Sequence, residues 1–294
     1  MERASVLETL RAKLGALGRP GGGAGRVVPL GLGPVDAGLP GGGLAACGVH
    51  EIADAALATI ARTGAEAAAP GDGPRHGPRL GEDAAATGFA AWAAGRLLAA
   101  AATPTVSGGA VWIAAEDDLY PPGLVRFGLA PADLLHVRTP RLPDRLWALE
   151  ECLRSGAVAV AVAELEAIDL TAGRRLQLAA EAGGAAALLL HRAAGRRRAA
   201  ALSASPALTR WRVAAEPAAT AGGGAVWRLD LVRCRDGRPG SWRVGWGSVQ
   251  PAGTGWAAVA APVQSANRGG SAVPQAEARC SAGYTPGQGG EQAA

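Results

Sequence analysis

Lysine, the residue with which a phosphate loop holds a nucleotide, is almost missing from this chain. Lys13 is its only lysine, although Lys and Arg together number 29. A phosphate loop of the GxxxxGK[ST] type uses its lysine on the β- and γ-phosphates and its Ser or Thr on Mg²⁺. The nearest approach is GEDAAATG, in which Gly81, Thr87 and Gly88 fit the pattern but two acids and no lysine stand between them. We therefore expect a degenerate nucleotide site that does not hydrolyse ATP, and not an enzyme, although a helix N-terminus there would still offer amide donors to an anion.

A cluster of arginines offers a second kind of phosphate chemistry. Arg192, Arg196, Arg197 and Arg198 fall within seven residues. Arginines so placed can neutralise the phosphates of single-stranded DNA without reading its sequence. A solvated basic loop would have the same composition. The net charge of +4 permits an anionic partner without requiring one.

Metal and disulfide chemistry find little support. Cys47, Cys152, Cys234 and Cys280 are widely spaced and form no CxxC pair, which favours reduced thiols over a zinc site or a disulfide framework. The N-terminal segment carries charges where a secretory signal would be apolar, and no run of about 20 strongly apolar residues is present. These features predict a soluble cytoplasmic protein without a metal, a cofactor or a membrane partner.

The elements that would position these residues alternate between strands and helices. The sequence predicts helices at 84–101, near 121–128, at 144–154 and at 172–182, and strands at 47–52, 110–115, 134–137, 157–163 and 185–190. The strand at 157–163 (AVAVAVA) is apolar throughout, as in a parallel sheet that is covered on both faces. Strands separated by helices indicate βαβ units, and therefore an α/β fold with a doubly wound, mostly parallel sheet.

A different pattern follows the last of these strands. Large apolar and polar residues alternate at 208–213, 226–234 and 241–246, and RDGRPG at 235–240 is a turn signal between the last two. This pattern predicts an antiparallel β extension at the edge of the sheet. Together with the parallel part, the extension completes a core domain over 27–250.

Two segments are poor in large apolar residues. Residues 63–80 are rich in Gly and Pro without apolar periodicity, which is typical of a flexible loop. Residues 251–294 consist largely of Gly, Ala, Ser, Gln and Pro. They cannot bury enough apolar surface to offset the entropy of ordering, so we expect a disordered C-terminal tail.

A short helix is predicted at 3–17. Leu7, Leu10, Leu14 and Leu17 recur there at helical spacing, and the linker RPGGGAG follows. Residues 1–26 would thus form a tethered N-terminal helix whose leucine stripe suits docking on a partner protein. Folding back on the chain's own sheet would bury the same stripe.

The organisation over 27–250 resembles the RecA core. The turn LPGGGL before CGVHEI is similar to the segment that precedes RecA's phosphate loop. The segments at 110–137 and 155–192 resemble the strands and connecting helices of the RecA sheet. The resemblance places Glu116 at the position of RecA's water-activating glutamate and Glu164 at that of its Walker B acid. Glu116 and Glu164 also have a purely structural interpretation. In it they are polar residues at strand ends that face solvent or cap the next element. The arginine cluster falls where RecA has its second DNA loop.

One branch of this superfamily, the ImuA-type proteins of bacterial damage-induced mutagenesis, resembles the chain more closely than RecA does. The matching motifs are LPGGGL with HEI, LTAGRRLQLAAEAGG at 170–184, TRWRV at 209–213 and WRLDLVRCRDGRPGSWRV at 227–244. The resemblance implies an accessory role in SOS-induced translesion DNA synthesis, acting through protein–protein association. The implied partners are an ImuB-type polymerase homologue, an error-prone C-family DNA polymerase and RecA, with single-stranded DNA as a further candidate.

Two other functions stay open at the level of sequence. An ATP-dependent DNA-binding recombination protein of the RecA class would use Glu116, Glu164 and the arginine cluster. An SOS cell-division inhibitor directed at the septum-forming GTPase would share the same sheet, but no residue is specific to it. The fold alone does not choose among these functions.

Overall fold

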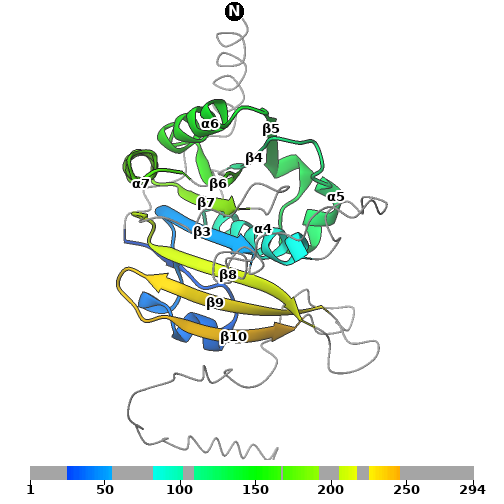
Figure 1. Ribbon diagram of the computed structural model, residues 1–294, viewed down its shortest axis with the longest axis vertical. Coiled ribbons are helices and arrows are strands. Elements are labelled where there is room, and N and C mark those ends of the chain that lie inside the picture. The colour runs from blue at the N-terminus through cyan, green and yellow to red at the C-terminus, as the bar shows by residue number, and fades with distance from the viewer. Residues whose placement is uncertain are drawn as a thin grey trace, which may run out of the picture. The chain divides into compact units, whose positions relative to one another are not determined.

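The computed structural model describes residues 25–54, 82–101, 109–166, 168–191, 205–216 and 225–245. Within these ranges the chain forms an eight-stranded sheet with helices on both faces (Figure 1). The predicted helix at 3–17, loop at 63–80 and tail at 251–294 lie outside the described residues.

The sheet is the predicted one. Its strands are β3 (Gly48–Asp54), β4 (Gly109–Ala114), β5 (Leu134–Arg138), β6 (Val158–Glu164), β7 (Ala186–His191), β8 (Thr209–Glu216), β9 (Val226–Cys234) and β10 (Gly240–Gly245). Their spatial order is β10-β9-β8-β3-β7-β6-β4-β5. All neighbours from β8 to β5 are parallel, whereas β9 and β10 add antiparallel strands beside β8. The α/β fold with an antiparallel extension is therefore confirmed.

Among the described residues, three long helices cover the two faces of the sheet. They are α4 (Glu82–Ala101), α6 (Leu142–Arg154) and α7 (Leu170–Gly183). Helix α4 closes one apolar cluster around Phe89, and α6 and α7 close the other around Leu149 and Leu176. Within the described ranges no helix is long and apolar enough to cross a membrane.

Shorter elements complete the fold, and the sequence analysis missed several of them. They are α2 (Gly33–Ala37), α5 (Pro121–Leu124), the 3₁₀ turns η1 (Pro40–Gly42), η2 (Val125–Phe127) and η3 (Pro131–Asp133), and the paired strands β1 (Val27–Val28) and β2 (Leu44–Ala45). The helix expected near 121–128 is thus split into α5 and η2. Both α5 and η3 have proline in their first turn, where its fixed φ angle suits the start of a helix. Neither element continues into a longer helix.

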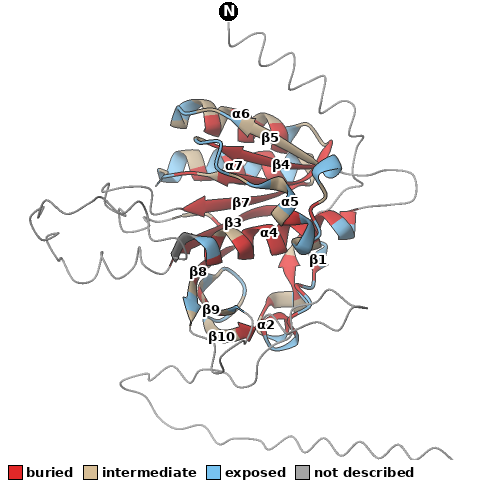
Figure 2. Ribbon diagram, turned by 90° about the vertical axis from the view of Figure 1, so that its right-hand side faces the viewer, coloured by how far each residue is buried: buried red, intermediate tan, exposed pale blue. Residues whose placement is uncertain are grey.

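Strand β6 shows why a continuous apolar run belongs in the middle of such a sheet. Val160 and Val162 point into the cluster under α4, while Ala161 and Ala163 point into the cluster under α6 and α7. Side chains alternate between faces along a strand, so burial on both faces requires apolar residues at every position. Figure 2 shows β7 and β4, which flank β6, and β3, which follows β7 in the sheet, as buried in the same way.

Small residues let α4 lie close to strand β9 of the antiparallel extension and to the turn η2. A Cβ atom on Gly88 would stand 2.5 Å from the ring of Trp227 on β9, and one on Gly95 would stand 1.9 Å from the carbonyl oxygen of Phe127. Neither position has room for a side chain. The glycines of α4 therefore serve helix packing, even though glycine lowers helix propensity.

Candidate functional site

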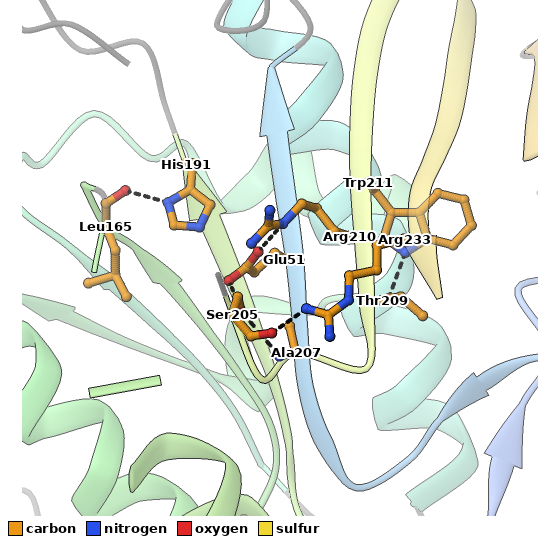
Figure 3. Close-up of polar contacts among 9 residues, drawn as sticks. All are labelled: Glu51, Leu165, His191, Ser205, Ala207, Thr209, Arg210, Trp211 and Arg233. Atoms are coloured by element: carbon orange, nitrogen blue, oxygen red, sulfur yellow. Dashed lines mark hydrogen bonds and ion pairs between the residues drawn. The ribbon is translucent and has the colours of Figure 1, made fainter. Parts of the chain in front are cut away.

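A buried carboxylate stands in the middle of strand β3. The Glu51 side chain is only 3% exposed. Figure 3 shows it between Ser205 and Arg210. Its Oε1 atom accepts a hydrogen bond from Ser205 Oγ at 2.5 Å, and its Oε2 atom accepts one from Arg210 Nε at 2.6 Å. Both oxygens are therefore engaged, and one guanidinium compensates the negative charge.

The register of the sheet produces this pair. Strand β8 runs parallel to β3, with Arg210 as the register partner of Glu51. Register partners present their side chains on the same face of a sheet. Every residue of β3 is buried, so a carboxylate at this position needs a partner. An unpaired buried charge would cost several kcal/mol, which Arg210 avoids.

His191 ends strand β7 beside this pair. Its Nδ1 atom lies 3.2 Å from the carbonyl oxygen of Leu165, and because a carbonyl only accepts, Nδ1 carries the proton. The Nε2 atom is buried and finds no hydrogen-bond partner in the part of the chain that the structure describes. Burial lowers the pKa of His191, the nearby Glu51 carboxylate opposes this change, and Arg210 adds to it. The imidazole is therefore neutral at pH 7.

A second buried histidine connects β3 to the start of β8 by a chain of hydrogen bonds. His50 Nε2 lies 2.9 Å from the carbonyl oxygen of Ala45, so Nε2 carries the proton and Nδ1 accepts from Thr209 Oγ1 at 2.8 Å. Thr209 Oγ1 in turn accepts from Trp211 Nε1 at 2.9 Å. Burial lowers the pKa of His50 to about 4. This chain of bonds serves to hold β2, β3 and β8 together.

Glu51, His191, Ser205 and Arg210 are called the Glu51 cluster below. Ser205 Oγ donates to a carboxylate and not to an imidazole, which is not the geometry of a nucleophile activated by a base. Arg233 donates to the carbonyl oxygen of Ser205. The cluster thus anchors the segment that enters β8 to the middle of the sheet.

The described residues offer little for metal or thiol chemistry. They contain no group of three or more His, Cys, Asp or Glu side chains that could hold a metal ion. Their cysteines, Cys47, Cys152 and Cys234, are free thiols. Burial raises the pKa of Cys152 to about 12, so this thiol stays protonated and unreactive.

The residues expected in a degenerate nucleotide site lie in two places. Thr87 and Gly88 are part of helix α4, and Gly81 lies outside the described residues. Glu116 is exposed just after β4, and Glu164 ends the neighbouring parallel strand β6. Both residues thus lie at the carboxyl ends of neighbouring parallel strands. Glu164 also accepts a hydrogen bond from Trp112 Nε1 at 2.9 Å.

The other candidate residues are not described. The leucine stripe at 3–17 and the cluster Arg192–Arg198 both lie outside the described ranges. The described residues that bracket the arginine cluster are His191 and Ser205, both members of the Glu51 cluster.

One face of the antiparallel extension carries arginines that the sequence analysis did not single out. On β9 and β10, Arg228 and Arg243 are register partners, and both contact Glu216, Arg243 Nε at 2.6 Å. Arg212 and Arg233 have no carboxylate partner within the described residues. The period-two alternation at 208–234 was the available signal, because it predicts one polar face on these strands.

Known proteins resemble the chain in sequence and in fold. Two proteins called Protein ImuA, from two strains of Caulobacter vibrioides, are each 37% identical to it over 225 residues, which is 74% of this chain and 82% of theirs. The crystal structure of the RadB recombinase matches with a TM-score of 0.50 and 13% identity, over 79% of this chain and all of that one. At so low an identity RadB supports the fold alone. No family model matches the sequence. The sequence identity, extending over most of both proteins, confirms the predicted resemblance, and the chain belongs to the ImuA family.

Proposed function

We propose that this protein is a non-hydrolysing, RecA-like accessory protein of damage-induced (SOS) error-prone translesion DNA synthesis. The observation that carries the proposal is membership of the ImuA family on a RecA-like sheet. The proposed partners are an ImuB-type polymerase homologue, an error-prone C-family polymerase and RecA. Association with these proteins, and not turnover of a substrate, is the proposed activity.

The state of the nucleotide site supports a role without ATP hydrolysis. The only lysine, Lys13, lies far along the chain from the strand ends at Glu116 and Glu164. Gly88 is packed against Trp227 inside helix α4, so it is not free to cradle a phosphate. Without a lysine on the phosphates, transfer of the γ-phosphoryl group loses a main source of charge stabilisation.

The described surface also offers material for contact with a protein. Tyr120 is 71% exposed and Val125 is 55% exposed, and both border helix α5. Tyrosine is enriched at protein interfaces because its ring is apolar and its hydroxyl is polar. These two side chains supplement the leucine stripe at 3–17 as candidate docking residues.

A second function, binding of single-stranded DNA, is favoured by two arginines of strands β8 and β9. Arg212 and Arg233 have no carboxylate partner within the described residues. They lie on the strands that follow the cluster Arg192–Arg198 in the chain. Phosphate contacts by such residues would be independent of sequence and weakened by salt.

The test is association of the purified full-length chain with an ImuB-type protein and with RecA, measured by surface plasmon resonance with and without ATP. The proposal expects micromolar or tighter binding to the ImuB-type protein that ATP leaves unchanged. Deletion of residues 1–20 should weaken binding without changing the thermal melt. A Tyr120→Ser, Val125→Ser double variant measures how much the exposed residues beside α5 contribute to binding, apart from the N-terminal helix. Binding to neither protein would contradict the adaptor role.

A further inference from the structure

One buried carboxylate is linked to both ends of the connection 192–204. His191 precedes this connection and Ser205 follows it. Ser205 Oγ donates directly to Glu51, and the His191 ring lies beside Glu51 (Figure 3). Burial lowers the pKa of His191, and the Glu51 carboxylate opposes this change. Arg210 contributes the cation that neutralises Glu51. Release of Glu51 would therefore loosen the entry into β8.

The charges around His191 come from several elements. Glu51 on β3 and Arg210 on β8 both act on its ring, as do the backbone groups of Leu165 and Glu166 after β6. Arg212 on β8 and His191 on β7 are both register partners of Ala53, so the two residues lie on the same face of the sheet. The Glu166 carboxylate is 63% exposed and is bound to Arg145 at 2.5 Å.

We propose that the Glu51 cluster is a pH-sensitive latch that holds strand β8 and the segment 205–208 to the parallel sheet, and that protonation of His191 opens it.

Charge balance gives the reason. With His191 neutral, the cluster contains one carboxylate and one guanidinium, and both carboxylate oxygens are occupied. A proton on His191 Nε2 would add a second cation beside a single buried anion. Uncompensated charge in a low-dielectric interior is costly, so the cluster would exchange partners or open.

The direction of the pH effect follows from the pKa of His191, which burial lowers in the closed state. In the open state the imidazole would return toward its ordinary value near 6.5. The latch is therefore stable above about pH 6.5 and weakens as the pH falls toward the lower pKa of the closed state. One proton linked to opening makes the opening constant rise about tenfold per pH unit within this window.

Hydrogen exchange on the full-length chain tests the latch between pH 7.5 and pH 5, after correction for the intrinsic exchange rate. The amides of 205–212 should lose about tenfold in protection per pH unit below pH 6.5. Amides of β6, in the middle of the sheet, report global unfolding and should change less. In His191→Gln, the pH dependence of protection at 205–212 should become weaker by a factor of about ten per pH unit, because one linked proton is removed. Any pH dependence that remains belongs to His50, which also contacts β8.

The matched control is His136→Gln, a half-buried histidine on the edge strand β5 that pairs with Asp117. It should keep the slope of the unmodified protein. Equal slopes in His191→Gln and the unmodified protein would overturn the proposal. If His191→Gln fails to fold, Ser205→Ala decides. Removing one donor to Glu51 should raise exchange at 205–212 already at pH 7.5, and unchanged exchange there would also overturn the latch.

Discussion

Glu51 and Arg210 face each other across the parallel strands β3 and β8, with 2.6 Å between Glu51 Oε2 and Arg210 Nε. The two side chains are 3% and 13% exposed, so the pair is almost removed from water. They are separated by 159 positions in the sequence. The pair therefore ties the last part of the sheet to its central strand.

Arg210→Ala should destabilise the protein by about 3–5 kcal/mol, because it leaves a buried carboxylate without its cation. Chemical unfolding followed by circular dichroism measures the loss. The control is Arg243→Ala, which breaks a pair with Glu216 that is 39% and 22% exposed and should cost about 0–1 kcal/mol. Similar losses for the two variants would show that the pair at Glu51 is not special.

The stability of the protein should fall as the pH is lowered from about 6.5 toward 4. Burial lowers the pKa of His50 to about 4, so the folded state resists a proton that the unfolded chain accepts near 6.5. The stabilisation is complete above the unfolded value and is lost on the way down to the folded value, by about 3 kcal/mol for this group. Unfolding curves of His50→Gln and of the unmodified protein, taken between pH 7 and pH 4.5, measure this loss of stability. A loss of the same size in both proteins would rule out His50 as its source.

The protein should not hydrolyse ATP, with or without single-stranded DNA. The reason is the missing lysine on the phosphates, for which the exposed Glu116 and the tryptophan-bound Glu164 do not substitute. A coupled phosphate-release assay, with RecA as the positive control, measures turnover. Faster turnover by the unmodified protein than by a Glu116→Ala, Glu164→Ala double variant would contradict this expectation.

Binding of single-stranded DNA should be weak, independent of sequence and steeply reduced by salt. Replacing Arg192, Arg196, Arg197 and Arg198 together by Ala should remove most of the salt-sensitive affinity in a fluorescence anisotropy titration. A control with the same loss of charge replaces four exposed arginines elsewhere, namely Arg126, Arg138, Arg141 and Arg174. If the control weakens binding as much as the cluster does, only net charge matters.

The alternation of strands and helices could be predicted because each element carries its own signal. The run AVAVAVA at β6 and the period-two pattern at β8 and β9 are local features. The small elements α2, β1 and β2 were missed, since segments of two to five residues have too little periodicity to be recognised.

The Glu51 cluster could not be predicted from such patterns. Its members come from three strands and from the segment before β8, so they meet only once the register is set. The period-two alternation places Arg210 on the polar face of β8. It does not show that this face is buried at Arg210. The available clue was a carboxylate at the centre of a short strand between the apolar residues Val49 and Ile52, because a buried charge requires a partner.

The most direct test of the proposed function is the frequency of damage-induced mutation in cells that lack this gene and carry it on a plasmid. The account predicts that the unmodified gene restores mutagenesis after ultraviolet irradiation, and that the Glu116→Ala, Glu164→Ala double variant restores it equally well. Deletion of residues 1–20 should abolish restoration if docking is the activity. Full restoration that is lost in the double variant, with the protein present at normal levels, would contradict an accessory role without ATP hydrolysis.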